Sequence, residues 1–442
     1  ESKKISFYGL NGQTWSGINC TKNNGSRISH ASIVDLVKGL QNYANIDNSL
    51  ISSESGYVLG MEWGDNNNFT GIAENCTIIG KIRVNKALLT NNSISNVTSR
   101  SFINYSTLIG NTFSGIELGI QYSVLENCKV LSSLIEFNYS GAIFCSFENC
   151  SLGMTSGGLY TQSVFTDCTF NNFTPAILRK SNLSNCSNIT ISTARSTIEE
   201  IDMRDNFWGY DKTREMDEYG LDYNLSFINE WYDDFNKTKA ILTGYKAEPY
   251  ENIGYLGDSY YPGNTEPGIE YAIGDTGPAG GLVFYDKGYY SYGWRYLEAA
   301  PSDLGAYVFG YYRATDNSDY LSTGTGYGIG SGRVNTEMLV ETMGGEAYSN
   351  DDKDGVRTAD YVAKKCTDYE AGGYDDWFLP SEEELNQMYL KLKEQELGGF
   401  SGGYYWSSSE YSAYSAWAQY FPNGSQSSYL RFVEYRVRPV RA

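Results

Sequence analysis

Short apolar runs, separated by Asn, Gly and Ser turns, fill the chain from about residue 70 to 205 without helical spacing. Five segments share one pattern, in which a β-like run leads to Asn or Asp, then Cys, then a second run: GIAENCTII, SVLENCKVL, CSFENCSLG, SVFTDCTFN and SNLSNCSNI. From Cys128, the cysteines at 150, 168 and 186 follow after 22, 18 and 18 residues. The pattern predicts a repeat of roughly twenty residues, in which cysteine stacks on cysteine in one column, with Val97 and Thr112 in the place of cysteine in two intervening turns.

A repeat this short cannot enclose a core alone, so each unit must bury its apolar side against its neighbours. Strand-like runs without helices predict a parallel β-helix over residues 71–250 and a mainly β fold class. We expect the cysteines to be small buried hydrophobic groups, a reading favoured over disulfide pairing. The asparagines before them suit left-handed corners, where their amides would stack as a hydrogen-bonded ladder; these are Asn75, Asn127, Asn149 and Asn185.

The two ends of the repeat are expected to be capped, because an open solenoid end exposes unpaired strand edges. Between Ser32 and Ala44, Ile33, Leu36, Val37 and Leu40 share a helical face, which predicts a short helix in an N-terminal cap or assembly segment, 1–70. Downstream, MRDNFWGYDKT and FINEWYDDFNKT resemble the terminal segment of right-handed β-helix repeat proteins. The matching residues are Asn206, Phe207, Trp208, Gly209, Tyr232, Asp233 and Asp234.

Residues 251–270 are rich in Gly, Pro and polar residues and predict a linker to a second domain, 271–442. In that domain Ser381 and Glu384 form a capping box before apolar positions at helical spacing, namely Leu385, Met388, Tyr389 and Leu392. A further helix is predicted from Thr358 to Cys366. This mixture predicts an α+β domain.

The final stretch, 402–442, interleaves bulky residues such as Trp406, Trp417 and Phe421 with Tyr, Ser and Ala. Tyr offers a large amphipathic contact surface with few rotatable bonds, and small residues let a partner approach, as in antibody binding loops. Strand propensity explains the same composition as Tyr-rich strands closing a sheet. The two interpretations are compatible, because a strand can carry one exposed face.

Charge narrows the choice of partners. The chain of 442 residues has a formal net charge of −20 and a pI near 4.5, whereas nucleic acids and anionic membranes select basic surfaces. No apolar run is long enough for a membrane span. Because the chain begins with Glu1 and no apolar signal segment follows, we expect a mature or trimmed form.

From Ala272 onward the sequence resembles the C-type-lectin-fold variable proteins of diversity-generating retroelements and the C-terminal domain of bacterial collagen-like adhesins. The motifs that carry the resemblance are IGDTGPAGG, LEAAP, GGYDDWFLPSEEEL, YYWSSSEY and VRPVRA. The resemblance implies a C-type-lectin-like fold whose surface residues are varied by mutagenesis of template adenines and which binds ligands outside the cell.

The resemblance also implies a variable region, 402–442, whose variable positions lie between the motif WSSSE and the terminal VRPVR. Carried over, the ligand-binding residues are Tyr411, Ala413, Tyr414, Ser415, Ala418, Tyr420, Pro422, Ser427, Ser428, Tyr429, Phe432 and Tyr435, with Leu430 and Val433 as further candidates. Mutating both adenines of an AAC codon can give these residue types but neither Trp nor Gln. Trp417 and Gln419 are therefore expected to be fixed framework.

The sequence gives little support for an enzymatic function. Formylglycine-generating enzymes share the lectin-like fold but need paired late cysteines, and none follows Cys366. Carbohydrate-active β-helices need clustered carboxylates, and the repeats here carry few charges. The only histidine is His30.

A calcium loop is suggested by Asn350, Asp352, Asp354 and Gly355, but Tyr361 replaces the glutamate that completes it, so a solvated acidic loop is favoured. The Gly-rich run 324–332 lacks the lysine of a phosphate loop and predicts a turn.

The sequence therefore predicts a binding protein without cofactor, metal or catalysis: a β-helix body followed by a diversified lectin-like domain. The expected partner is a protein or glycan receptor on a cell surface. The expected location is extracellular, on a phage tail or a bacterial surface, and a homo-oligomer such as a trimer is anticipated. A fixed-specificity adhesin or lectin, or a β-helix carbohydrate enzyme with a lectin-like targeting module, are the alternatives.

Overall fold

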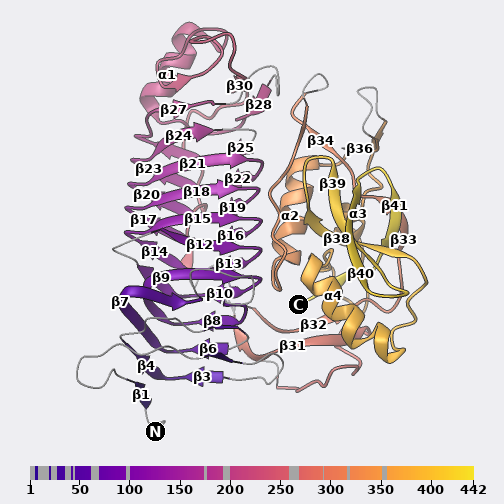
Figure 1. The fold of residues 1–442 in the computed structure, drawn as a ribbon. Helices are drawn as coiled ribbons and strands as arrows, with labels where there is room; N and C mark the ends of the chain where they lie inside the picture. Colours follow the sequence, from indigo (N-terminus) through magenta and orange to yellow (C-terminus); the bar gives the residue numbers. More distant parts are fainter. Residues whose placement is uncertain are drawn as a thin grey trace. The chain divides into compact units, whose positions relative to one another are not determined.

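The computed structural model describes residues 5–7, 19–20, 27–34, 41–42, 45–60, 69–95, 100–173, 177–192, 200–257, 268–291, 293–315, 319–350 and 356–442. The chain divides into two compact units, Glu1–Gly257 and Asp258–Ala442 (Figure 1). The first is a parallel β-solenoid and the second an α+β domain, so the predicted mainly β fold class is confirmed.

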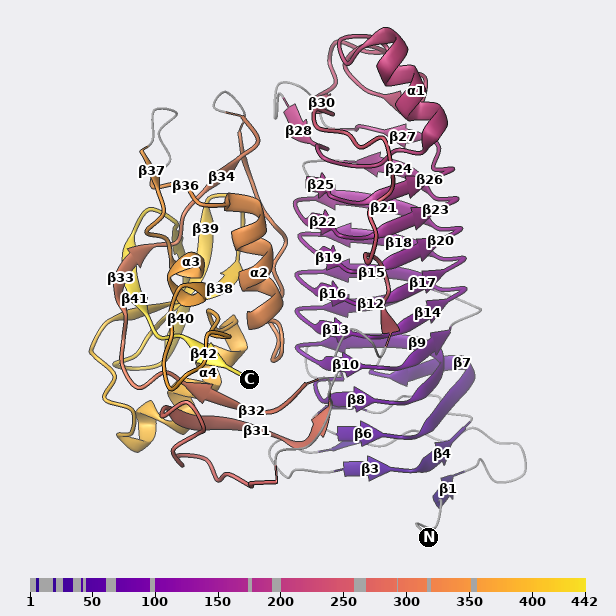
Figure 2. The ribbon, with the colours of Figure 1, turned by 180° about the vertical axis from the view of Figure 1, so that it is seen from behind.

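The solenoid passes through three columns of parallel strands in each turn (Figure 2). The first column holds β3 (Arg27–Ser29), β6 (Asn45–Asp47), β8 (Ile72–Glu74), β10 (Leu88–Thr90), β13 (Thr107–Ile109), β16 (Val124–Glu126), β19 (Gly141–Ile143), β22 (Leu159–Thr161) and β25 (Ile177–Arg179). The second holds β1 (Ile5–Phe7), β4 (Ala31–Ile33), β7 (Leu50–Leu59), β9 (Thr77–Asn85), β11 (Ser93–Ser95), β14 (Thr112–Ser114), β17 (Lys129–Leu131), β20 (Ser146–Glu148), β23 (Val164–Thr166) and β26 (Asn182–Ser184). The third continues from the long β9 through β12 (Ser101–Asn104), β15 (Glu117–Gln121), β18 (Leu134–Asn138), β21 (Ser151–Ser156) and β24 (Thr169–Phe173).

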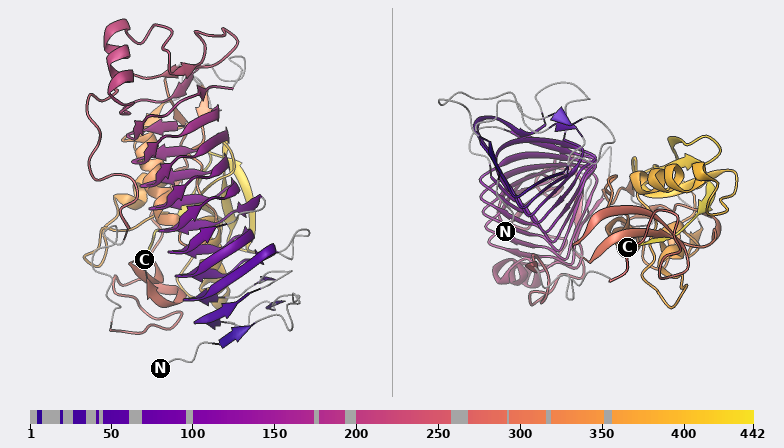
Figure 3. Two further views of the ribbon diagram at one scale, coloured as in Figure 1. Left: turned by 90° about the vertical axis from the view of Figure 1, so that its left-hand side faces the viewer. Right: turned by 90° about the horizontal axis from the view of Figure 1, so that it is seen from below.

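The core is a stack of like residues, because the middle residue of each three-residue strand faces inward. Leu89, Leu108 and Leu125 pair in register across three turns and are at most 1% exposed. Phe147 and Phe165 stack at 4.9 Å between ring centroids in the second column. Figure 3 shows the rungs from the side and the coil around one core from below.

Each corner is made by a residue with positive φ followed by an inward-facing residue. At the corner after the first column, Asn75 (φ 50°) and Asn127 (φ 50°) precede Cys76 and Cys128. At the corner after the second column, Asn149 (φ 52°) and Asn185 (φ 55°) precede Cys150 and Cys186. The predicted left-handed corner asparagines and buried cysteines are therefore confirmed, and all seven described cysteines outside Cys20 are free thiols.

Two details of the predicted repeat are wrong. The cysteines occupy two columns rather than one, since Cys76, Cys128 and Cys145 lie at the first corner and Cys150, Cys168 and Cys186 at the second. The spacing of 22 residues from Cys128 to Cys150 therefore crosses from one corner to the other. At the first corner Asn111, and not Thr112, takes the equivalent place. Val97 lies outside the described residues.

The hydrogen-bonded ladder runs through the inward-facing corner residues rather than through the predicted asparagines. At the first corner each backbone N–H donates to a side chain of the next turn: Cys76 to Asn92 (2.9 Å), Asn92 to Asn111 (3.0 Å), Cys145 to Ser163 (3.1 Å), Ser163 to Ser181 (3.2 Å) and Ser181 to Asn206 (3.0 Å). Of the predicted ladder, Asn75 accepts from Asn91 at 2.7 Å, but Asn149 donates to Ser132 and Asn127 to the carbonyl of Gly257. A corner that is buried needs an acceptor for its N–H, which Cys, Ser and Asn can each supply.

The N-terminal segment belongs to the solenoid. Ser32 and Ile33 lie in β4, which pairs in parallel with β1 and β7, and Gln41–Asn42 form β5, paired with β2 (Asn19–Cys20). The predicted helix from Ser32 to Ala44 is therefore wrong at both ends, because an inward Ile in a parallel ladder outweighs a short helical pattern. Residues 35–40 lie outside the described part of the chain.

The C-terminal end of the solenoid is closed by helix α1 (Tyr210–Tyr219) and the strand pairs β27 (Ile189–Thr190) with β29 (Ile228–Asn229) and β28 (Glu200–Asp202) with β30 (Lys239–Ile241). Trp208 is fully buried and packs on Phe227 at 5.4 Å. The predicted linker begins as part of this unit, since Leu256 donates to Asn127 at 2.8 Å and Tyr255 to Ser146 at 2.8 Å. Its residues 258–267 lie outside the described part.

The second unit contains two main sheets. One has the order β31 (Leu282–Ser291), β32 (Trp294–Ala299), β42 (Val440–Arg441), and the other β33 (Gly305–Val308), β41 (Glu434–Val437), β38 (Tyr404–Glu410), β39 (Ser415–Tyr420), β40 (Ser425–Leu430). Two short pairs join β34 (Tyr312–Arg313) to β35 (Tyr320–Leu321) and β36 (Ala347–Tyr348) to β37 (Arg357–Thr358). The helices are α2 (Gly332–Met343), α3 (Val362–Thr367), α4 (Glu382–Lys391) and the 3₁₀ turn η3 (Lys393–Gln395).

The helix predictions for this unit have mixed outcomes. The capping box is confirmed, since Glu384 N–H donates to Ser381 Oγ at 3.2 Å and Ser381 N–H to Glu384 Oε2 at 2.8 Å. The helix expected from Thr358 to Cys366 begins only at Val362, because Arg357–Thr358 is a strand. The sequence analysis predicts no helix at α2. The Gly-rich run, which is expected to form a turn, leads directly into its first residues.

We predict that Asn111→Ala lowers the free energy of unfolding of the solenoid by about 2 to 3 kcal/mol, because it leaves buried polar groups unpaired. Asn111 is fully buried, accepts from Asn92 and donates to the carbonyl of Leu89 at 2.7 Å. Urea denaturation measures the change. Asn171→Ala, at an exposed asparagine in β24, is the matched control, and an equal loss from both variants would contradict the ladder.

Candidate ligand-binding surface

The terminal motif positions the sheet through two buried arginines. Arg438 bonds Asp303 through Nε (2.8 Å) and Nη2 (2.7 Å), and the same carboxylate accepts from Tyr405 at 2.8 Å. Arg441 makes two bonds of 2.8 Å to Asp376. Bidentate arginine pairs fix orientation as well as distance, so VRPVRA holds the last strands against the rest of the unit.

Four tyrosines form the centre of the exposed face of the five-stranded sheet, and we call them the tyrosine platform: Tyr404, Tyr420, Tyr429 and Tyr435. The ring of Tyr404 lies 4.7 Å from Tyr420, 4.8 Å from Tyr429 and 4.8 Å from Tyr435, between centroids. All four are half-buried. A side-chain hydrogen bond with Tyr404, together with burial, raises the pKa of Tyr429 to about 12, so its hydroxyl is neutral and can donate or accept.

Strand register explains why these rings share a face. Tyr404 pairs with Tyr420, which pairs with Ser425, and Trp406 pairs with Ala418, which pairs with Ser427. Since side chains alternate across a strand, these residues point to one side. The other side faces α4, where Gln419 donates to Asn386 at 3.1 Å and Gln426 to the carbonyl of Glu382 at 3.0 Å.

Trp406 supports the platform from the side, on the same face of the sheet. It is fully buried, packs on Tyr435 at 4.9 Å and on Phe309 at 5.6 Å, and donates from Nε1 to the carbonyl of Tyr307 at 3.1 Å. The small residue Ala418, 1% exposed, lies next to it. The platform is thus a group of half-exposed Tyr side chains packed against a buried aromatic residue.

A second group of predicted residues lies in the loop after β38 and at the first residue of β39, and we call it the loop patch: Tyr411, Ala413, Tyr414 and Ser415. Tyr411 and Tyr414 are 47% and 48% exposed. Tyr414 packs edge-on to Tyr320 at 5.7 Å between centroids, and Ala413 packs on the cluster of Tyr311, Tyr320 and Tyr348. Aromatic residues from a distant part of the chain therefore support the loop patch.

The predicted ligand-binding residues do not form a single patch. Tyr420, Ser427, Tyr429 and Tyr435 belong to the face of the platform, and Ala418 lies there but is buried. Pro422 and Phe432 are exposed in turns that flank β39 and β40. Ser428 pairs with Trp417 on the side of the sheet that faces α4. Leu430 is 45% exposed at the end of β40, and Val433 is half-buried in the following turn.

The sequence analysis missed two residues that build the site. Tyr404 is the centre of the platform, yet it is absent from the predicted ligand-binding residues. Tyr320 supports the loop patch from a distant part of the chain. The period-2 register of YYWSSSE with SAWAQY could have placed Tyr404 opposite Tyr420, whereas no local signal points to Tyr320.

A buried ion pair, also missed, joins the two segments that carry the loop patch and the Phe432 turn. Arg431 Nη2 lies 2.6 Å from Glu410 Oε1, and both side chains are 1% exposed. Glu410 Oε2 also accepts from Ser322 (2.9 Å), Thr323 (2.6 Å) and the N–H of Gly324 (2.9 Å). The arginine donates in addition to the carbonyl of Ser412. The loop patch, whose residues are expected to vary, is thereby anchored to an ion pair that is closed to solvent.

The predicted framework residues differ in their surroundings. Gln419 is fully buried and donates to Asn386 and to the carbonyl of Gly424. Trp417 is half-buried between Tyr327 and Tyr411, at 6.1 and 5.9 Å between centroids. Trp417 therefore reaches the surface beside the loop patch.

Metal ligation has no support in the part of the chain that the structure describes, which contains no group of three or more His, Cys, Asp or Glu side chains suited to hold an ion. Of the suggested calcium loop, Asn350 is described, whereas Asp352, Asp354 and Gly355 lie outside the described residues. Within the same described ranges, no helix is long and apolar enough to cross a membrane.

The fold and this surface together define a domain that displays Tyr- and Ser-rich residues on a fixed scaffold. Residues 333–441 match the family model of the Lcl C-terminal domain. The match, which covers α2 to β42, indicates a variable, ligand-binding protein of the diversity-generating kind, and it agrees with the resemblance carried by the sequence motifs. No curated protein matches the chain.

We predict that Trp406→Ala destabilises the second unit by about 3 to 5 kcal/mol, because it removes a fully buried aromatic side chain. Tyr411→Ala is the aromatic control, and at 47% exposure it should change stability by less than about 1 kcal/mol. Thermal unfolding followed by near-ultraviolet circular dichroism measures both. Equal destabilisation would mean that Tyr411 is framework rather than binding surface.

We predict a pH dependence that originates at Glu384. Burial raises its pKa to about 7, against the opposing effect of hydrogen bonds from Ser381, Gly330 and Gly332. Because the folded pKa exceeds the unfolded value near 4.5, its contribution to stability is complete below pH 4.5 and is lost as the pH rises towards 7, by about 3 kcal/mol.

Glu384→Gln should flatten this decline in urea unfolding curves measured between pH 4.5 and 7.5. Glu383→Gln, a neighbouring and more exposed glutamate in α4, keeps the wild-type slope. A wild-type slope in the Glu384 variant would contradict the assignment.

Proposed function

We propose that this protein is a diversified receptor-binding protein that recognises a protein or glycan on a cell surface through the tyrosine platform and loop patch. The observation that carries the proposal is the platform, in which the ring of Tyr404 lies 4.7 to 4.8 Å from the rings of Tyr420, Tyr429 and Tyr435, beside buried Trp406. Aromatic residues supported in this way are the usual anchors of protein interfaces. Small neighbours such as Ser425 and Ser427 leave room for a partner and offer adaptable hydroxyls.

We further propose that the protein acts outside the cell, at the tip of a phage tail, with a bacterial surface adhesin as the alternative. The long solenoid supports a role as a spacer or assembly body, and a homo-oligomer such as a trimer would raise affinity by multivalency. In this proposal the protein binds without catalysis and without a cofactor. The net charge of −20 supports the choice of a partner that is neither nucleic acid nor an anionic membrane.

The direct test is binding of the purified full chain to a panel of bacterial cells by flow cytometry. We predict that Tyr420→Ala/Tyr429→Ala reduces binding at least tenfold, because it removes two aromatic anchors of roughly 1.5 kcal/mol or more each. Tyr219→Ala/Tyr223→Ala is the matched control, since it removes an exposed stacked pair from the solenoid cap. Equal binding by both double variants would exclude the platform as the receptor site.

Sequencing the encoding locus in several isolates tests the diversification itself. Adenine-specific changes confined to codons between Trp406 and Arg438, beside a template copy and a reverse transcriptase, are expected. Neighbouring structural genes would separate phage from cell. An invariant terminus would instead leave an adhesin or lectin of fixed specificity.

A further inference from the structure

A pocket with a volume of about 400 Å³ lies within the second unit, along the hairpin of β31 and β32, and we call it the hairpin pocket. Its volume falls within the range of small-molecule sites, about 300–1,000 Å³. Three of the sequence motifs meet there, since its walls include Pro278 of IGDTGPAGG, Tyr374 of GGYDDWFLPSEEEL and Arg441 of VRPVRA. None of the predicted ligand-binding residues lines it, so the pocket is distinct from the tyrosine platform and the loop patch.

Strand register brings much of the lining to one face of the sheet β31–β32–β42. Glu298 of β32 pairs with Val283 of β31 on one side and with Arg441 of β42 on the other. Trp294 and Tyr296 occupy alternate positions of the same strand as Glu298. Because side chains alternate across a strand, these residues point towards the pocket together.

Aromatic rings form most of the walls. The aromatic residues of the lining are Tyr271, Tyr290, Trp294, Tyr296 and Tyr374. Tyr271 packs edge-on against Tyr296 at 5.5 Å between centroids, and its N–H donates to the hydroxyl of Tyr296 at 3.2 Å. A ligand would therefore meet apolar ring surface with polar groups at its edges.

Cations already lie against three of these rings. The charged groups of Lys287, Arg295 and Arg441 lie over Trp294, Tyr296 and Tyr374, at 4.1, 4.8 and 3.9 Å from the ring centroids. A cationic ligand would have to compete with these groups for the negative faces of the rings. The pocket therefore does not suit a cation.

The arginines of the pocket are also taken by carboxylates. Arg441 makes two bonds of 2.8 Å to Asp376, and Arg295 donates to Asp286 at 3.0 Å. Glu298, which is 3% exposed, accepts from two backbone N–H groups at 3.2 and 2.6 Å. Each charged side chain of the lining thus has partners of its own, which favours a ligand without charge.

One hydrogen-bond donor of the lining has no partner. Trp294 is 7% exposed, and its indole N–H makes no hydrogen bond with any residue that the structure describes. Buried indole N–H groups usually find a partner, and those of Trp377 and Trp406 donate to backbone carbonyls at 3.2 and 3.1 Å. An acceptor on a ligand would complete the hydrogen bonding of Trp294.

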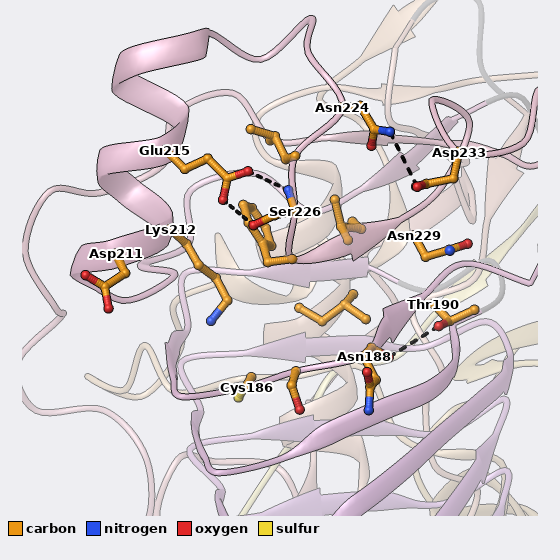
Figure 4. A pocket seen from close by; sticks show the side chains of 15 residues that line it. Cys186, Asn188, Thr190, Asp211, Lys212, Glu215, Asn224, Ser226, Asn229 and Asp233 are labelled. Atoms are coloured by element: carbon orange, nitrogen blue, oxygen red, sulfur yellow. Dashed lines mark hydrogen bonds between the residues drawn. The ribbon is translucent and has the colours of Figure 1, made fainter.

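A groove at the capped end of the solenoid differs in this respect. Its walls come from residues 186–190, from α1 and from residues 224–229 (Figure 4). There the polar side chains bind one another, since Glu215 accepts from the hydroxyl of Ser226 at 2.6 Å and Asp233 accepts from Asn224 at 3.4 Å. We therefore assign that groove to the closure of the solenoid.

A sugar ring has the properties that the hairpin pocket selects. It is uncharged, its C–H groups form an apolar face that can pack on an aromatic ring, and its hydroxyl groups accept hydrogen bonds. A purely apolar molecule would leave the N–H of Trp294 without a partner, which costs free energy in a buried site. We propose that the hairpin pocket binds one neutral sugar residue, with its C–H face on the aromatic rings and one hydroxyl group accepting from Trp294 Nε1.

Saturation-transfer NMR of the full chain with glucose, galactose and mannose tests the proposal, and isothermal titration calorimetry then gives the affinity. At least one of the three sugars is expected to bind. Its uronic acid and its protonated 2-amino derivative are expected to bind at least tenfold more weakly, because neither charge finds a free partner in the pocket.

Two pocket variants locate the site. Trp294→Phe keeps an aromatic ring but removes the N–H, and it is expected to weaken binding by about three- to tenfold. Tyr374→Ala removes an exposed wall and is expected to weaken binding by about tenfold. Trp231→Phe, at a half-buried tryptophan of the solenoid cap, is the matched control and leaves affinity unchanged. Melting temperatures establish that each variant is folded.

The platform variant Tyr420→Ala/Tyr429→Ala separates this proposal from receptor binding, because it is expected to keep the full affinity for the sugar. Loss of sugar binding in that variant would place the sugar on the platform and overturn the proposal. Absence of saturation transfer to all three sugars would do the same. So would equal affinity for a charged derivative, or unchanged affinity in both pocket variants.

Discussion

The buried pair of Glu410 and Arg431 is the interaction on which the presentation of the binding surface depends. It connects the end of β38, the segment 322–324 and the turn after β40, and it is closed to solvent. Removing one member of a buried pair leaves the other charge unpaired, at a cost of about 3 to 5 kcal/mol. Because the pair lies below the loop patch, the loop above it can change composition while its backbone keeps its course.

The same separation of support and display recurs across the second unit. Arg438 and Arg441 hold the final strands through Asp303 and Asp376, and Trp406 carries the platform. Residues that determine the fold therefore lie in the interior or face α4, whereas most of the residues expected to vary point outward or lie in turns. A surface built in this way tolerates many sequences, since substitutions at exposed positions typically change stability by less than about 0.5 kcal/mol.

The solenoid and the second unit could be predicted from the sequence because both follow from local patterns. The Asn-Cys corners repeat at nearly fixed spacing, and Ser381 with Glu384 form a capping box that depends on neighbouring residues only. Prediction failed where partners are distant in the chain. The assignment of Cys128 and Cys150 to two different columns needed the three-cornered cross-section, and the pairing of Glu410 with Arg431 needed the course of β39 and β40. Likewise Tyr320 reaches the loop patch only through the tertiary fold.

The corner positions of the solenoid accept Cys, Ser or Asn with the same backbone geometry, since each can receive the N–H of the adjacent turn. One turn is therefore interchangeable with the next, and a gene duplication or deletion of a whole repeat would leave every corner satisfied. Each such event would change the length of the stack by one strand spacing, about 4.8 Å. The length of the solenoid can therefore evolve in small, separate steps, independently of the specificity of the surface that follows it.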